Sequence, residues 1–198
     1  MKIINAKVFT PAFTFTDKDI CVLHEKFSAD SLDNCVVDAN GLYAIPGLID
    51  IHFHGAVGCD FMDGTKESLR SIAAYEASVG VTSICPATMT MRREDILKAC
   101  TNACDFSPDV KCSSLVGINM EGPFICSKKK GAQAATHIHK PDVAMFRRLQ
   151  EAANGLIRLV DIAPEVEGAM EFISELKDEV HISFAHTTAD YDTAKTGY

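Results

Sequence analysis

Residues 46–55 decide the fold, and they read Pro46-Gly47-Leu48-Ile49-Asp50-Ile51-His52-Phe53-His54-Gly55. Side chains two residues apart in a strand project from the same face, so we expect His52 and His54 about 6–7 Å apart on one face. Two neutral imidazoles at this spacing can share one divalent metal ion. The alternative is a buried strand in which a histidine only bonds a backbone carbonyl. The pair lies where an apolar strand gives way to a glycine-containing loop, which favours a metal site.

The composition is that of a soluble globular chain, with 198 residues, 47% hydrophobic and 23% charged. This length allows one domain or slightly more. A net charge of −8 and a pI near 5.3 argue against a nucleic-acid or anionic-membrane partner. Because no secretion signal precedes the fold and no apolar run approaches the roughly 18 residues of a membrane span, we expect a cytoplasmic protein.

The chain contains eight cysteines without a C-x-x-C pair, and most of them lie in apolar segments. In a chain without a secretion signal, this pattern favours reduced thiols in the core over a disulfide framework. A structural zinc site is the alternative.

Two patterns divide the chain near residue 45. Residues 1–45 show short apolar stretches separated by polar turns, which predict part of a small β domain. Residues 46–198 alternate between helical and strand patterns. We expect helices over residues 69–79 and 96–104, from Pro141 onward and over 169–176, and strands over 81–85, 114–120, 156–162 and 180–185. This alternation predicts an α/β fold with a parallel sheet.

The strand ends favour a (β/α)-barrel over a doubly wound sheet. The stretch Gly55-Ala56-Val57-Gly58 lacks the third glycine of a dinucleotide fingerprint. Residues capable of chemistry instead follow several strands, as the rim of a barrel requires. They are His52 with His54, then Glu121, Glu165 and His186. We count about five barrel strands where a complete barrel has eight, so we expect the first portion of a barrel over residues 46–198.

Four stretches resemble a known family. Residues 46–55 are similar to the P-G-x-I-D-x-H-x-H-G start of the amidohydrolase superfamily. The others are similar, in order and spacing, to N-acetylglucosamine-6-phosphate deacetylases: Glu121-Gly122-Pro123-Phe124 with Lys130-Gly131-Ala132-Gln133, Ala163-Pro164-Glu165, and Ala185-His186-Thr187-Thr188-Ala189. The resemblance implies a metal-dependent hydrolase barrel, with a small β domain built from both chain ends. It also implies hydrolysis of the acetamide of N-acetylglucosamine 6-phosphate to acetate and glucosamine 6-phosphate.

The resemblance also implies roles for individual residues. Glu121 and His186 would bind the main metal ion, Zn or Fe, and His52 and His54 a second ion found in some members. Ala132 and Gln133 fall where the family contacts the phosphorylated amino sugar. Many members have histidine at the Gln133 position, and glutamine cannot titrate. The catalytic acid/base aspartate and a further metal-binding histidine would lie beyond Tyr198, so we identify no catalytic residue within the chain.

Two other interpretations remain open. A different metal-dependent amidohydrolase, of the dihydroorotase kind, would usually carry a carbamylated lysine on a middle strand, and residues 157–162 contain no lysine. The chain could also be a non-catalytic fragment that at most binds metal. A partial barrel leaves strand edges and apolar surface uncovered, so we further expect a homo-oligomer.

Overall fold

The computed structural model describes residues 1–29 and 35–198. The chain divides into two compact units, Met1–Gly47 and Leu48–Tyr198. In the first unit, the strands are β1 (Lys2–Phe9), β2 (Phe15–Leu23), β3 (Lys26–Ser28), β4 (Val36–Asp38) and β5 (Tyr43–Ala44). They form one sheet in which β1 pairs antiparallel with β2 and parallel with β4 and β5. The strands expected within residues 1–45 are therefore present as a single β layer.

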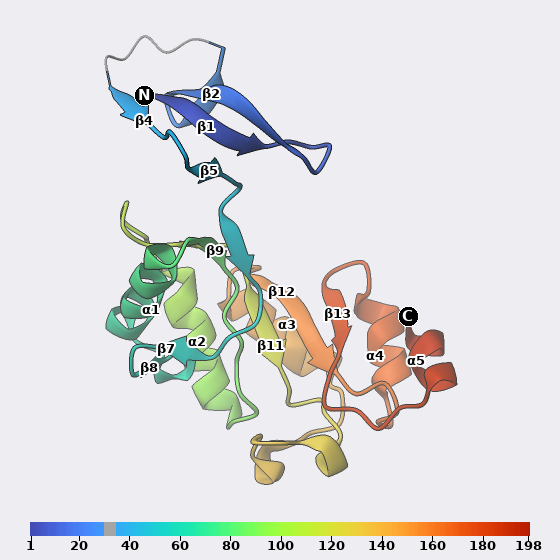
Figure 1. Cartoon of the computed structure of the whole chain (residues 1–198). Helices are drawn as coiled ribbons and strands as arrows, with labels where there is room; N and C mark the ends of the chain where they lie inside the picture. Colours follow the sequence, from blue (N-terminus) through green and yellow to red (C-terminus); the bar gives the residue numbers. More distant parts are fainter. Residues whose placement is uncertain (30–34) are drawn as a thin grey trace. The chain divides into compact units, whose positions relative to one another are not determined.

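The second unit alternates strands and helices (Figure 1). Its strands are β6 (Leu48–Asp50), β7 (Gly55–Ala56), β8 (Cys59–Asp60), β9 (Val81–Ile84), β10 (Ser114–Leu115), β11 (Ile118–Glu121), β12 (Ile157–Ile162) and β13 (His181–Phe184). Its helices are α1 (Lys66–Ser78), α2 (Arg93–Cys104), α3 (Val143–Ala152), α4 (Ala169–Leu176) and α5 (Tyr191–Gly197), with short 3-10 turns η1 (Phe61–Asp63), η2 (Ser127–Lys129) and η3 (Ala135–His137).

Parallel pairing dominates this unit, as the alternation predicted. The strands β10, β9 and β6 form one parallel sheet in that order, and β11, β12 and β13 form another. A single parallel bridge between Ala87 and Asn119 links the segments that follow β9 and begin β11. The short hairpin of β7 and β8 is antiparallel. The predicted α/β class is confirmed.

The main core of the second unit lies between its helices and the sheet formed by β11, β12 and β13. It contains buried residues of α2, α3 and α4 packed against β11 and β12. The ring of Phe172 lies 5.0 Å from that of Phe124 and 5.9 Å from that of Phe146, measured between centroids. These aromatic contacts join α3 and α4 to the segment that follows β11. They fix the strand whose end carries Glu121.

Side-chain caps set where the helices begin. Thr65 accepts a hydrogen bond from the backbone N–H of Ser68 and so begins α1. Asp142 accepts one from the N–H of Met145 and begins α3. The expected start of this helix at Pro141 was therefore early, because the cap and not the proline marks the first turn.

The strand expected over residues 114–120 is two strands separated by Val116 and Gly117. A Cβ atom on Gly117 would lie 2.5 Å from Cγ of Arg158 and 3.2 Å from Sγ of Cys85. The chain therefore passes between these side chains only as glycine. The segment before this point pairs with β9, and the segment after it pairs with β12.

The strand that leads to the two histidines is shorter than predicted. It ends at Asp50, whose Oδ1 accepts a hydrogen bond from the N–H of His52 at 3.0 Å. This local side-chain bond competes with continued strand pairing. His52 and His54 consequently lie in the segment after the strand, and the expectation that both project from one strand face was wrong.

The cysteines form no disulfide in the part of the chain that the structure describes. Only Cys85 and Cys100 are buried, so the expectation that most are core thiols was wrong. Within residues 1–29 and 35–198, none of the helices combines the length and apolar character that a membrane crossing requires.

Candidate metal centre

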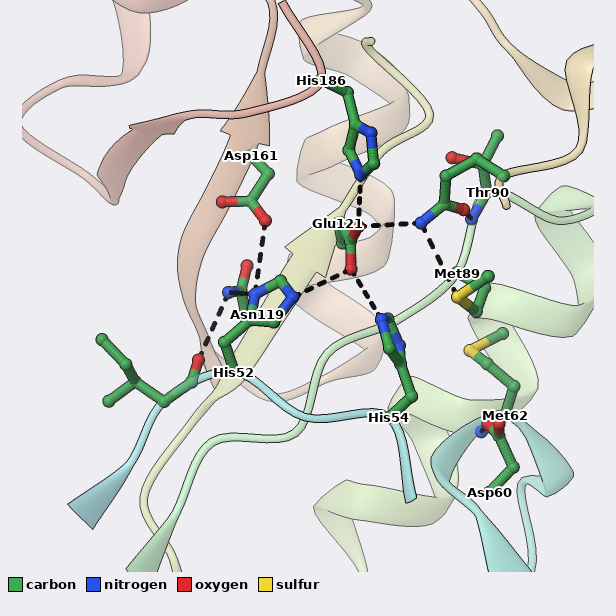
Figure 2. A network of polar contacts seen from close by, with 12 residues as sticks. His52, His54, Asp60, Met62, Met89, Thr90, Asn119, Glu121, Asp161 and His186 are labelled. Carbon is green, nitrogen blue, oxygen red and sulfur yellow. Dashed lines mark hydrogen bonds and ion pairs between the residues drawn. The ribbon is translucent and has the colours of Figure 1, made fainter. Parts of the chain in front are cut away.

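The carboxylate of Glu121 lies at the centre of three imidazole rings (Figure 2). Its Oε2 atom lies 3.2 Å from Nε2 of His52 and 2.9 Å from Nε2 of His54. Its Oε1 atom lies 2.5 Å from Nε2 of His186 and 2.9 Å from Nε2 of Gln133. Each oxygen of one carboxylate therefore faces a different set of nitrogen atoms.

The backbone aims Glu121 into this position. It is the last residue of β11, and Gly122 follows with a φ of 74°. A Cβ atom on Gly122 would lie 2.1 Å from Oγ1 of Thr90. Only glycine fits both the positive φ and the close approach, so the chain turns sharply directly after the carboxylate.

Backbone hydrogen bonds hold the histidine segment beside its neighbours. The N–H of Ala87 donates to the carbonyl of Phe53 at 2.7 Å, and the N–H of Phe61 donates to the carbonyl of His54 at 2.7 Å. These bonds fix the main chain between the two histidines and at the second of them. Irregular backbone held in this way still places both rings at Glu121.

The charge distribution favours an ionised carboxylate. Burial raises the pKa of Glu121, but its contacts with His54, His186 and Gln133 outweigh burial and hold the pKa at about 2. The same carboxylate raises the pKa of His54 against the opposing effect of burial. Burial lowers the pKa of His186, but Glu121 and the Lys129 carbonyl outweigh it and raise that pKa. Glu121 thus gives the centre a fixed negative charge.

The position of His186 leaves one ring nitrogen for the site. Its Nδ1 lies 2.9 Å from the carbonyl oxygen of Lys129. A carbonyl can only accept, so Nδ1 carries a proton, and Nε2 of the neutral ring would offer its lone pair to a cation bound beside Glu121. This is how a second hydrogen bond commonly prepares a histidine to bind a metal ion.

Glu165 supports the loop that carries His186. Its Oε2 accepts a hydrogen bond from Oγ1 of Thr187, and its Oε1 accepts bonds from Thr188. Burial raises the pKa of Glu165, but these bonds outweigh it and hold the pKa at about 2. Glu165, which we expected at the barrel rim, therefore stabilises the loop that follows His186.

A second buried carboxylate faces His52 (Figure 2). Oδ2 of Asp161 lies 3.7 Å from Nδ1 of His52, and Nδ2 of Asn119 lies 3.0 Å from the same atom. Asp161 is 2% exposed, and burial raises its pKa. Its Oδ2 atom has no hydrogen-bond partner among the described residues. This acceptor is close to the nitrogen of His52 that faces away from Glu121.

The donor set fits a divalent cation. The ligand atoms of His52, His54 and Glu121 lie within 4.8 Å of one another. Oε2 of Glu121 is buried and lacks a hydrogen-bond partner among the described residues, although two imidazole nitrogens lie beside it. An orphaned carboxylate oxygen facing imidazole nitrogens is suited to a shared cation, and nitrogen with oxygen donors suits Zn²⁺ or Fe²⁺. The His52 and His54 side chains are 46% and 34% exposed, so the site is open to solvent on their side.

The chain is similar in sequence to proteins of known function. No protein-family model matches the chain. The chain is 39% identical over 162 residues to N-acetylglucosamine-6-phosphate deacetylase of Bacillus subtilis (strain 168), which is 77% of this chain and 41% of the relative. It is 33% identical over 153 residues to the enzyme of the same name from Vibrio furnissii, 76% of this chain and 38% of the relative. The chain is homologous to the N-acetylglucosamine-6-phosphate deacetylases. It spans less than half the length of these curated relatives.

Solved deacetylase structures have the same fold. The N-acetyl-D-glucosamine-6-phosphate deacetylase of Mycobacterium smegmatis matches with a TM-score of 0.85 and 23% identity, over 100% of this chain and 53% of that chain. A mutant of that enzyme in complex with N-acetyl-D-glucosamine-6-phosphate matches with a TM-score of 0.73 and 28% identity, over 86% and 45% of the two chains. The resemblance of the sequence motifs to deacetylases is confirmed.

The structure brings together most of the residues that the deacetylase motifs single out. His52, His54, Glu121 and His186 meet, and Gln133 joins them through Glu121. Ala132 precedes Gln133 in the chain, and it is exposed to solvent.

Sequence reasoning missed Asp161, Asn119 and Thr90. Asp161 and Asn119 each occur within an apolar strand, in Leu-Val-Asp-Ile and Ile-Asn-Met-Glu. A polar residue in a strand buried on both faces is a usable signal, because such a group requires a partner. Thr90 contributes its backbone N–H, which donates to Oε1 of Gln133 at 2.6 Å, and no sequence pattern reveals this bond.

Proposed function

We propose that this chain is part of a metal-dependent deacetylase that hydrolyses the acetamide of N-acetylglucosamine 6-phosphate to acetate and glucosamine 6-phosphate. The observation that carries the proposal is the placement of three histidines around the buried Glu121 carboxylate in a homologue of these enzymes. The solved structure of a mutant deacetylase in complex with N-acetyl-D-glucosamine-6-phosphate supports a phosphorylated amino sugar as the substrate.

The proposed architecture is the first portion, about five of eight strands, of a (β/α)-barrel over residues 46–198, with part of a small β domain over residues 1–45. Two features support it. The strands β6, β9, β11, β12 and β13 are parallel to their neighbours. The polar cluster lies at the carboxyl end of β11 and directly after the carboxyl ends of β6 and β13, as in a barrel active site.

Each residue of the cluster has a proposed role. Glu121 and His186 would hold the main ion, and His52 and His54 would hold a second ion. When bound, a divalent ion such as Zn²⁺ or Fe²⁺ supplies Lewis acidity for an amide carbonyl and for the activation of water. Glu121 provides the negative charge that attracts it, and the Lys129 carbonyl keeps the His186 lone pair available.

Substrate contact and proton transfer are assigned to residues outside the metal ligands. Ala132 and Gln133 are proposed to contact the sugar. The acid/base aspartate is proposed to lie beyond Tyr198, in the part of the relatives that this chain does not span. We further propose a cytoplasmic location and a homo-oligomer, without nucleic-acid or membrane partners.

Metal analysis tests the centre directly. We expect the purified chain, stripped of adventitious ions and then exposed to micromolar Zn²⁺ or Fe²⁺, to retain stoichiometric metal. The Glu121→Gln variant should lose it, because the charge at the centre is removed. Glu76→Gln is the matched control, since Glu76 is also buried, at 7% exposure, but lies in α1. Absence of metal uptake by the unmodified chain would contradict the proposed centre.

Acetate release separates the proposed function from its alternative, a fragment that at most binds metal. We expect little or no deacetylation by residues 1–198 and clear activity from a chain that extends to the length of the relatives. The loss of a general acid/base group commonly costs about 10²- to 10⁴-fold in rate. Equal acetate release by both chains would show that the acid/base group lies within residues 1–198.

A further inference from the structure

The amide of Gln133 bridges Glu121 and the backbone of Thr90. Its Nε2 donates to Oε1 of Glu121 at 2.9 Å, and its Oε1 accepts from the N–H of Thr90 at 2.6 Å. Gln133 is 2% exposed and Thr90 is 1% exposed. Both hydrogen bonds are buried, so water does not readily replace either of them.

These two bonds fix the direction of the amide. The Thr90 N–H is a backbone donor, so it requires the carbonyl end of the Gln133 amide. The NH₂ end is then directed at Glu121. A side chain with only a donor or only an acceptor could satisfy one of these partners but not both.

The fixed amide in turn fixes the carboxylate. The terminal torsion of a glutamate side chain is broad, so an isolated carboxylate can rotate. The bond from Gln133 retains Oε1 on the side of His186, which leaves Oε2 between His52 and His54. The orientation of Glu121 at the cation position therefore depends on Gln133.

We propose that Gln133 is a positioning residue that holds the Glu121 carboxylate in the orientation required for cation binding. This role differs from contact with the sugar, and it rests on the proposed metal-dependent function. Outer partners of metal ligands typically contribute about 10- to 100-fold to metal affinity. Gln133 acts through Glu121 and need not touch the ion.

Gln150 provides a matched control within the same unit. Its amide also makes two hydrogen bonds, in which Nε2 donates to the carbonyl of Ile157 and Oε1 accepts from the N–H of Ile157, both at 2.9 Å. It joins α3 to β12 and is not part of the cluster around Glu121. Loss of either amide removes a donor and an acceptor that are both in use, and for Gln133 also a longer contact of Nε2 with Sδ of Met89 at 3.6 Å. Only the Gln133 amide contacts a proposed metal ligand.

The test compares Zn²⁺ affinity of the unmodified chain, Gln133→Met and Gln150→Met by competition with a chromogenic chelator. Methionine retains the length of glutamine without its hydrogen bonds. We expect Gln133→Met to bind Zn²⁺ about 10- to 100-fold more weakly. We expect Gln150→Met to lower the thermal midpoint while leaving Zn²⁺ affinity unchanged. Circular dichroism verifies the fold of each variant before titration.

The outcomes separate this inference from the proposed function. If the unmodified chain binds no Zn²⁺, the metal centre and this inference both fail. If it binds Zn²⁺ and Gln133→Met binds equally well, only the role of Gln133 fails. If Gln133→Met does not fold, the side-chain amide signals of the unmodified chain decide by NMR. The Gln133 signals should shift on addition of Zn²⁺ and those of Gln150 should not, and unmoved Gln133 signals would overturn the inference.

Discussion

Thr188 donates two hydrogen bonds to one oxygen of Glu165, from its backbone N–H at 2.6 Å and from its hydroxyl at 2.9 Å. Thr187 donates to the other oxygen of the same carboxylate. These residues directly follow His186, whose φ of 50° is unusual for a residue with a side chain. Glu165 thus stabilises the strained turn that presents His186 to Glu121.

We predict that Glu165→Gln weakens this turn. The amide has one acceptor oxygen, and its NH₂ group would face a donor, so at least one of the hydrogen bonds is lost. The free energy of unfolding should fall by about 1 kcal/mol, measured by urea denaturation. Glu167→Gln is the control, because Glu167 pairs with Lys140 on the exposed surface, where an ion pair contributes little. Equal effects of both substitutions would contradict a special role for Glu165.

The low pKa of Glu165 predicts a pH dependence. Its pKa is about 2 in the folded chain, below the ordinary value of 4.5. Between these two pH values the folded chain therefore binds fewer protons at Glu165 than the unfolded chain does. The stabilisation is therefore complete above about pH 4.5 and is lost as the pH falls toward 2. The difference in unfolding free energy between the unmodified chain and Glu165→Gln should shrink over that range. A difference that stays constant from pH 6 to pH 3 would show that the charge of Glu165 contributes nothing.

We predict that Gly122→Ala displaces Glu121. The new Cβ atom would lie 2.1 Å from Oγ1 of Thr90, at a φ of 74°. The substitution could act through the steric clash or through the positive φ, and Gly155→Ala separates these two causes. Gly155 has a φ of 78° but nothing within 4 Å of its Cβ position. Both substitutions carry backbone strain of about 1 kcal/mol, and only Gly122→Ala adds a clash. We expect loss of Zn²⁺ uptake in Gly122→Ala alone, and the same loss in Gly155→Ala would exclude a local cause.

Asp161→Asn should lower metal affinity through His52. A cation at Nε2 of His52 would require the ring proton on Nδ1. The NH₂ group of Asn119 beside this atom cannot accept that proton, so the acceptor would be the Asp161 carboxylate 3.7 Å away. We expect Zn²⁺ affinity to fall by about 10-fold, the lower end for an outer partner. Asp142→Asn also removes a charge, but asparagine caps a helix as well as aspartate, so this control should retain the affinity.

Self-association is predicted to involve β6. Leu48, Ile49 and Ile51 are 51%, 65% and 52% exposed, and β6 lies at the end of its sheet among the described residues. An exposed apolar edge strand recruits further strands. Ile49→Lys should therefore reduce the average mass measured by light scattering. A monodisperse 21.5 kDa species before any substitution would contradict the proposed oligomer.

The sequence allowed prediction of the alternating elements and of the main cluster, for a physical reason. Helical and strand periodicities are local, and polar residues that follow parallel strands meet at one edge. The end of β6 could not be predicted, because the Asp50 side chain bonds the N–H of His52 in place of a neighbouring strand. The break at Gly117 depends on Arg158, a residue distant in the sequence. Sequence patterns of single elements contain neither contact.

The two oxygens of Glu121 belong to one delocalised group, although they face different histidines. A cation on the Oε2 side withdraws electron density that a cation on the Oε1 side would also use. Occupancy of the two proposed positions would consequently be linked, and such linkage is reciprocal. If both positions take a cation, the second should bind with lower affinity than the first, and a titration would show negative cooperativity between positions that share a single ligand.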